Sequence, residues 1–170
     1  MPLRLSICLA AALALGLCWA QRAGAQGAPA MHPIPAAECQ TFASQIQAAI
    51  GFAAKATEDD FTDLTDGSEG RSCHISGSTS GQAFAAPTEL LAKLAPVFSG
   101  WQDDPARADS GPAEADKGFV SSNRIAAVAV SWEPGPGASC SDKQPLSACN
   151  ITPQQKLWTV TVDIVEKAAK

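Results

Sequence analysis

Residues 158–164, within the segment 157–166, alternate strictly between apolar and polar side chains, and this segment constrains the fold more than any other. Strict alternation is typical of a β-strand with one buried and one exposed face. Residues 125–132 repeat the pattern, with Val128, Val130 and Trp132 on the better apolar face. Together the segments predict an antiparallel hairpin whose apolar face needs cover from other elements. In residues 157–166 the apolar positions are Trp158, Val160, Val162 and Ile164, and the polar ones are Thr159, Thr161 and Asp163.

Two segments can supply that cover as amphipathic helices. Residues 36–54 place apolar side chains three or four positions apart, with uncharged polar residues on the other face. Residues 88–98 show a similar stripe, although Pro96 is expected to shorten or kink that helix. The apolar stripe of the first helix comprises Cys39, Phe42, Ala43, Ile46, Ala49, Ile50 and Ala53.

The segments between these elements are shorter or less regular. Residues 58–69 are acidic and are interpreted as a short strand or irregular turn. Residues 71–78 predict a strand. Residues 77–81 and 102–116 are rich in Gly, Pro, Ser or Asp and are interpreted as loops. In the predicted strand Cys73 and Ile75 face inward, and Ser72, His74 and Ser76 face outward.

These elements predict an α+β fold in two layers. Two helices are expected to cover one face of a small antiparallel sheet, with disulfides stabilising the sandwich. At 170 residues the chain is expected to form one domain. We place a signal peptide at 1–25, a flexible lead-in at 26–35, a single α+β domain at 36–166 and a solvated tail at 167–170.

The first 25 residues have the order of a secretory signal peptide. Arg4 gives a positive start, residues 5–20 are apolar, and Ala23-Gly24-Ala25 is a small-residue cleavage site. The apolar run is shorter than the roughly 20 residues that a spanning helix needs, which argues against a retained anchor. Leu17 precedes Cys18 where a lipid-attachment site needs a small residue. We therefore expect cleavage near Ala25 and a periplasmic or secreted product with no transmembrane anchor.

Cleavage would leave four cysteines, which are expected to form two disulfides in an exported chain. Cys140 and Cys149 would close a Pro/Gly-rich loop, and Cys39 would then join Cys73 and fasten the first helix to the sheet. This pairing is one of three that four cysteines allow. Removal of Arg4 and Arg22 leaves 10 of the 12 basic residues against 17 acids. This acidic balance argues against a phosphate-binding surface and therefore against nucleic acid as a partner.

Three features of the sequence are candidates for catalytic or metal sites. The acids of residues 58–69 could bind calcium, but their spacing does not match the helix–loop–helix calcium motif. His74 lacks a visible catalytic partner, and Thr79 stands where the Gly77–Gly81 segment would need a nucleophilic serine. Two His residues are too few for a typical zinc site. The sequence therefore gives no ground for a catalytic residue, a metal or a cofactor.

Two tryptophans remain as candidate binding residues. Trp101 follows the second helix, and Trp132 ends a strand next to the Cys140–Cys149 loop. Aromatic side chains at the ends of elements often line contact surfaces. The function that the sequence favours is an exported, non-enzymatic binding or accessory domain whose partner is an envelope protein or a small ligand. The alternative is a hydrolase or metal-dependent enzyme that uses His74 and the nearby acids.

Overall fold

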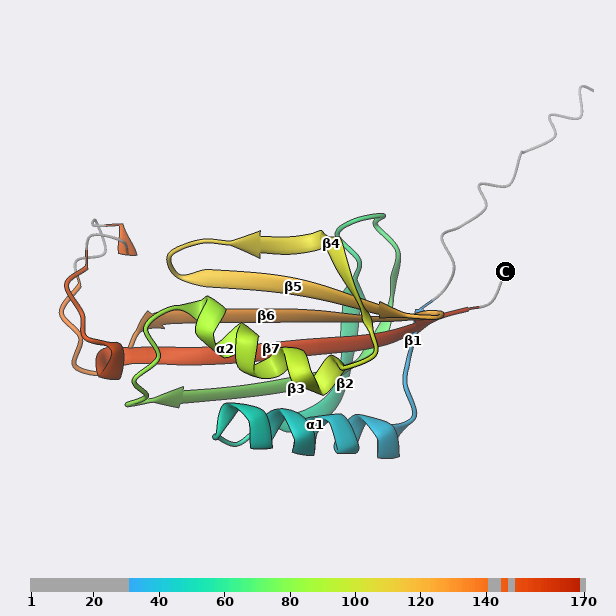
Figure 1. The fold of residues 1–170 in the computed structure, drawn as a ribbon, viewed down its shortest axis with the longest axis horizontal. Helices are drawn as coiled ribbons and strands as arrows, with labels where there is room; N and C mark the ends of the chain where they lie inside the picture. Colours follow the sequence, from blue (N-terminus) through green and yellow to red (C-terminus); the bar gives the residue numbers. More distant parts are fainter. Residues whose placement is uncertain (1–30, 141–144, 147–148, 169–170) are drawn as a thin grey trace, which may run out of the picture.

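A seven-stranded sheet with two helices on one side forms the body of the protein (Figure 1). The structure is a computed structural model that describes residues 31–140, 145–146 and 149–168. The elements in chain order are β1 (Met31–Pro33), α1 (Ala36–Ile50), β2 (Lys55–Thr62), β3 (Glu69–Ser80), α2 (Pro87–Leu94), the 3₁₀ turn η1 (Ala95–Phe98), β4 (Gln102–Ser110), β5 (Glu114–Ser121), β6 (Arg124–Pro134), the 3₁₀ turn η3 (Pro153–Gln155) and β7 (Lys156–Lys167).

The strands lie in the order β2-β3-β1-β7-β6-β5-β4, so that β2 and β4 are the two edges of the sheet. All long neighbours are antiparallel, and β3 also pairs directly with β7. The short strand β1 is antiparallel to β7 and parallel to β3, which makes the sheet mixed. The β6–β7 pair confirms the hairpin expected from the alternating segments, with Val130 opposite Val160 and Trp132 opposite Trp158.

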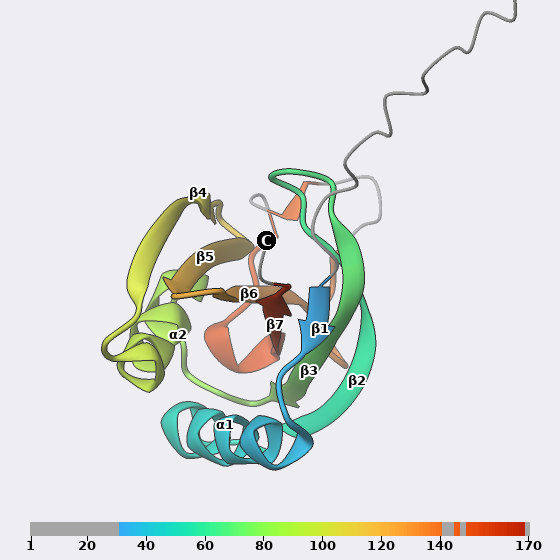
Figure 2. The ribbon, with the colours of Figure 1, turned by 90° about the vertical axis from the view of Figure 1, so that its right-hand side faces the viewer.

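The main core lies between the helices and one face of the sheet (Figure 2). In β7 the side chains of Trp158, Val160, Val162 and Ile164 are at most 1% exposed, and they share this core with the stripe of α1. Helix α1 ends at Gly51, which adopts the left-handed conformation (φ 82°) that glycine tolerates best. Helix α2 begins at Pro87 and passes into η1, where Pro96 has no backbone N–H to continue the α-helical pattern.

The predicted fold class is wrong in the size and composition of its sheet. The fold is a long, mixed, seven-stranded sheet with two short helices, whereas the sequence suggested a small antiparallel sheet under two helices. Much of the difference comes from residues 102–116, which form β4 and the start of β5 instead of a loop. Pro105 argued against a strand, but it lies where the β4–β5 register shifts and on an edge strand, which tolerates a missing N–H.

Two other boundaries also differ from expectation. Part of the predicted lead-in forms β1, and the nearby side chains of Met31 and Ile34 are each 2% exposed. At the other end, Lys167 belongs to β7 and not to a solvated tail. Residues 1–30, which include the predicted signal peptide, lie outside the described residues. On the face opposite the helices, Met31 packs with Ile125 and Val165 in a second, smaller apolar cluster.

Candidate functional site

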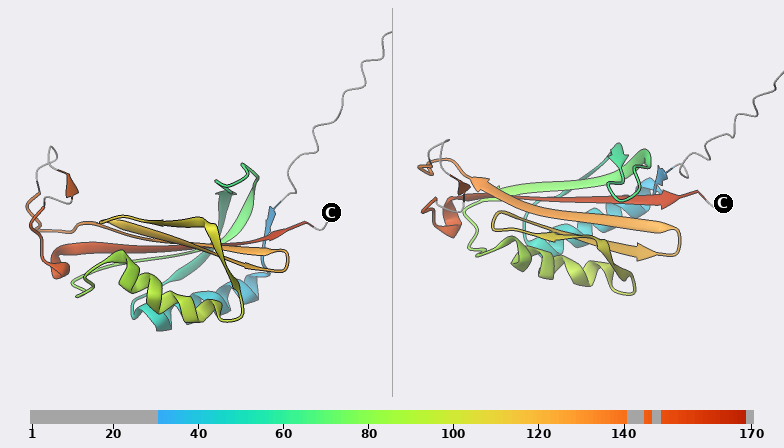
Figure 3. Two further views of the ribbon diagram at one scale, coloured as in Figure 1. Left: turned by 45° about the horizontal axis from the view of Figure 1, so that its top comes forward. Right: turned by 90° about the horizontal axis from the view of Figure 1, so that it is seen from above.

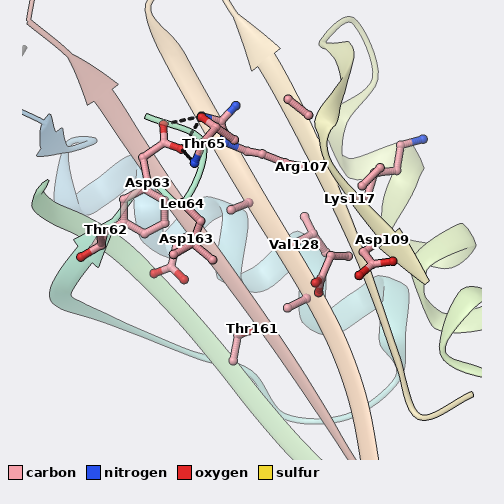
Figure 4. Close-up of a pocket in the computed structure, with 16 residues that line it drawn as sticks. Thr62, Asp63, Leu64, Thr65, Arg107, Asp109, Lys117, Val128, Thr161 and Asp163 are labelled. Carbon is pink, nitrogen blue, oxygen red and sulfur yellow. Dashed lines mark hydrogen bonds and ion pairs between the residues drawn. The ribbon is translucent and has the colours of Figure 1, made fainter. Parts of the chain in front are cut away.

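A cleft of about 600 Å³ lies on the face of the sheet opposite the helices (Figure 4). Its floor comes from the outward-facing side chains of β6 and β7, which are small or polar. In one row of the sheet Asp116, Ala129 and Thr161 are neighbours, and in the next row Gly118, Ala127 and Asp163 are neighbours. Because the alanines carry only a methyl group, the middle of this face is left hollow.

The turn between β2 and β3 forms one wall of the cleft. It rises from the sheet on the side away from the helices (Figure 3). The opposite wall is β4, where the pairing with β5 shifts between Asp104 and Asp109. Such irregularities redirect side chains at sheet edges and next to binding sites. Here the residues of the shifted segment that line the cleft are Ala106, Arg107, Ala108 and Asp109.

Arg107 joins the two walls. Its guanidinium donates to Asp63 and to Thr65 Oγ1 in the β2–β3 turn (Figure 4), and also to Asp104 on its own strand. The Arg107 side chain crosses close above β5, and a Cβ at Gly118 would lie 2.6 Å from the Cβ of Arg107. Glycine at position 118 therefore makes room for this contact, which we call the Arg107 clasp. The clasp connects β4, one edge of the sheet, with the turn that follows β2, the other edge.

Asp63 is the buried end of the clasp, and its side chain is fully covered. Burial acts to raise the pKa of Asp63, but the hydrogen bonds from the Thr65 side chain and backbone and the Arg107 guanidinium outweigh it, and the pKa lies below its ordinary value. Lys167 adds a further link, with Nζ 2.9 Å from Asp66 Oδ2 and 3.5 Å from Asp63 Oδ2. The β2–β3 turn is therefore held in place over the sheet by charged groups from both β4 and β7.

Asp109 and Asp116 form a pair of like charges in the cleft, directly opposite each other on β4 and β5. Like charges in this position weaken a sheet. Burial, together with the carboxylates of Glu114 and Asp109, raises the pKa of Asp116. Because the pKa is raised in the fold, stability falls as the pH rises from the ordinary value of 3.8 through the folded value, and the loss is complete above it. Within the described residues no Lys or Arg forms an ion pair with either Asp109 or Asp116.

His74 and Asp163 form a pair at the border of the cleft. His74 Nδ1 lies 2.9 Å from Asp163 Oδ1, and Ser72 Oγ donates to the same oxygen at 2.7 Å. An ionised carboxylate only accepts hydrogen bonds, so Nδ1 of His74 is the donor. Ser72 and His74 lie on the face opposite the helices, as predicted, but Ser72 is buried there and not exposed to solvent. Asp163 as the partner of His74 was missed, because the two residues are 89 positions apart and their register cannot be inferred from either strand alone.

The structure does not bring the two candidate tryptophans together. Trp101 packs on Phe42 and Phe98 on the helix-covered side. It directly precedes Gln102, the first residue of β4, and so lies near the end of the sheet where β6 begins. Trp132 lies at the other end of β6, is 7% exposed, and donates from Nε1 to Pro112 O at 2.9 Å. Its ring also contacts the Lys156 ammonium, 4.2 Å from the ring centroid. Both side chains therefore contribute to packing on the face opposite the cleft.

The four cysteines lie in the pairs Cys39–Cys73 and Cys140–Cys149, with Cα atoms 5.8 and 5.7 Å apart. The acids of residues 58–69 do not gather at one point: Glu58 and Asp60 pair with Arg71, and Asp63 pairs with Arg107. Among the described residues, no three His, Cys, Asp or Glu side chains are arranged to hold a metal ion.

Comparisons with known proteins give no relative: no family model, curated protein or solved structure matches this chain. In the part of the chain that the structure describes, no helix is both long and apolar enough to cross a membrane. The two disulfide pairs are compatible with a periplasmic or extracellular location, where such bonds persist.

Replacing Arg107 with alanine is expected to lower the free energy of unfolding by about 2 kcal/mol at neutral pH, because it leaves Asp63 buried with fewer partners. Thr65 and Lys167 remain near Asp63, which keeps the loss below that of a fully isolated charge. Because the pKa of Asp63 is lowered in the fold, its stabilising effect is present above the ordinary value of 3.8 and is lost as the pH falls through the folded value.

Denaturant unfolding at pH 7 and at pH 3 measures both effects, and Arg71→Ala is the matched control. Arg71 also pairs with two carboxylates, but on the exposed face of a hairpin. Its loss should therefore cost clearly less than the loss of Arg107, because solvent screens an exposed ion pair. If both variants lose the same free energy of unfolding at pH 7, the Arg107 clasp is not a buried ion pair in solution.

Proposed function

We propose that this protein is an exported, non-enzymatic binding domain and that the cleft is its ligand-binding site, which we call the ligand seat. The observation that carries the proposal is a cavity of about 600 Å³ that combines apolar side chains on its floor and walls with a few polar groups. Cavities of this size and lining are typical of small-molecule sites. A small ligand therefore suits the cleft better than an envelope protein, which would need a broad contact surface.

Export to the periplasm or the cell exterior rests on the sequence and on the cysteines. The charged start, short apolar run and small-residue site of residues 1–25 support cleavage near Ala25. Two disulfide pairs support an oxidising compartment. The Arg107 clasp and the Cys39–Cys73 bond would keep the cleft preformed, and a preformed site loses less entropy when a ligand binds.

The His74–Asp163 pair is the feature that favours the second candidate, a hydrolase. In a serine hydrolase the nucleophilic hydroxyl must donate to the histidine that removes its proton. Ser72 instead donates to Asp163, the residue that would orient the histidine, and Ser72 is fully buried. The arrangement fixes the His74 ring but gives it no nucleophile to activate in this group of three, which supports binding over catalysis.

Ala129→Phe is expected to abolish ligand binding, because a phenyl ring at the centre of the floor fills the cleft. Ala129 lies on the uncovered face between Asp116 and Thr161. The measurement is the ligand-induced rise in melting temperature across a library of small organic compounds, since a ligand that binds only the folded state stabilises it. Compounds that stabilise the wild type should not stabilise Ala129→Phe.

Ser131→Phe is the matched control, since Ser131 lies two residues further along β6 on the same face and outside the cleft. It should bind as the wild type does. Binding that survives in Ala129→Phe would show that the ligand seat is elsewhere. An enzymatic activity that disappears in a folded His74→Ala variant would replace the binding proposal with the hydrolase.

A further inference from the structure

The charges around the cleft are unbalanced, and this imbalance identifies the chemistry of a ligand. Three carboxylates, Asp109, Asp116 and Asp163, line the cleft in addition to the buried Asp63. Of these, Asp63 already has the Arg107 guanidinium as its partner, and Asp163 has His74 and Ser72. The like-charged pair Asp109–Asp116 has no cationic side chain within ion-pair distance in the described part of the chain.

The two cationic residues that line the cleft do not offset this pair. Arg107 is engaged by Asp63, Asp104 and Thr65. Lys117 places its ammonium 2.9 Å from Asp103 Oδ2 and 5.0 Å from the centroid of the Phe119 ring. In Figure 4 the amine of Lys117 points away from Asp109 and Asp163. The field inside the cleft is therefore negative.

The rest of the lining is apolar or carries hydroxyl groups. The floor has the methyl groups of Ala127 and Ala129 with Thr161 beside them, and the β2–β3 wall adds Phe61 and Leu64. A ligand that matches this lining needs an apolar body, and a ligand that matches the field needs a positive charge. Binding such a ligand would also relieve the repulsion between Asp109 and Asp116, which the fold otherwise sustains.

We propose that the cleft binds a small organic cation, in which an ammonium or amidinium group is carried on a compact apolar body. The inference rests on the proposed function, because it assumes that the cleft is a ligand seat. In the complex the charged group lies between Asp109 and Asp116, and the apolar body lies over Ala127 and Ala129. Burial, and after it the carboxylates of Glu114 and Asp109, raise the pKa of Asp116, and a bound cation would act in the opposite direction.

The test uses three apolar bodies, benzyl, hexyl and indolylethyl, each as a primary amine, an alcohol and, for benzyl, a carboxylate. Calorimetric titration of the full-length exported protein at pH 7 and low ionic strength measures the affinities. We expect the best amine to bind at least about tenfold more tightly than its alcohol, and phenylacetate to bind most weakly. Added salt should reduce the difference in affinity between each amine and its alcohol, because salt screens the attraction between the ammonium and the carboxylates.

Charge-neutral variants separate this inference from the proposed function. Asp116→Asn and Asp109→Asn should each weaken amine binding about tenfold and leave alcohol binding unchanged. Asp59→Asn is the matched control, because Asp59 is exposed on β2 outside the cleft. This variant should bind the amines and the alcohols with the affinities of the wild type.

Two results would contradict the inference in different ways. If alcohols or phenylacetate bind as tightly as amines, and Ala129→Phe abolishes that binding, the ligand class is wrong and the ligand seat stands. If none of the amines, alcohols or the carboxylate binds, or if Ala129→Phe binds all of them as the wild type does, the ligand seat itself is wrong.

Discussion

Joint replacement of Cys39 and Cys73 by alanine is expected to lower the free energy of unfolding by about 4 kcal/mol. The bond closes a segment with a sequence separation of 34, and the chain-entropy model gives about this value for a loop of that length. The bond also holds the start of α1 against β3, and both cysteines are buried at 6% and 1% exposure. Alanine is the suitable replacement because serine would place a hydroxyl in an apolar core.

Joint replacement of Cys140 and Cys149 by alanine is the comparison for this prediction. Their sequence separation is 9, for which the same model gives about 2–3 kcal/mol. Urea unfolding followed by circular dichroism measures both losses. A larger loss from the Cys140–Cys149 pair than from the Cys39–Cys73 pair would contradict the role assigned to the bond between helix and sheet.

Ile46→Ala is expected to cost about 2–5 kcal/mol, because it removes buried methyl and methylene groups and leaves a cavity. Ile46 is fully buried in the main core, in the middle of the α1 stripe that faces the sheet. The neighbouring Gln45 is exposed on the opposite face of the same helix. Gln45→Ala should therefore change the free energy of unfolding by less than about 0.5 kcal/mol. Equal unfolding midpoints for the two variants would mean that α1 presents a different face to the sheet.

The apolar faces of the fold could be predicted because they depend on local periodicity. The alternation in residues 157–166 and the stripe of residues 36–54 assign each side chain to the core or to solvent without reference to any distant residue. The outward orientation of His74 and Asp163 could be predicted in the same way. Their contact could not, because it depends on the register between β3 and β7, which are 89 positions apart at these residues.

The elements that form the walls of the cleft were harder to predict from the sequence. The β4 strand was missed because Pro105 and the register shift disrupt the alternation that identifies a strand. One signal was present: Arg107 is the only basic residue in the otherwise acidic segment 102–116. A second was the run of alanines on the outward face of residues 125–132, which leaves a sheet face hollow. Only the three-dimensional structure shows that Arg107 reaches across the sheet to Asp63.

The most direct test of the central claim is to locate a bound amine on the sheet. Methyl-labelled alanine allows an NMR titration with benzylamine in which each methyl group reports its own surroundings. The account predicts saturable shifts at Ala127 and Ala129 on the cleft floor, and none at Ala43 and Ala115, which are buried on the helix-covered side. Shifts confined to Ala43 and Ala115, or the absence of saturable shifts at Ala127 and Ala129, would contradict a ligand seat in the cleft.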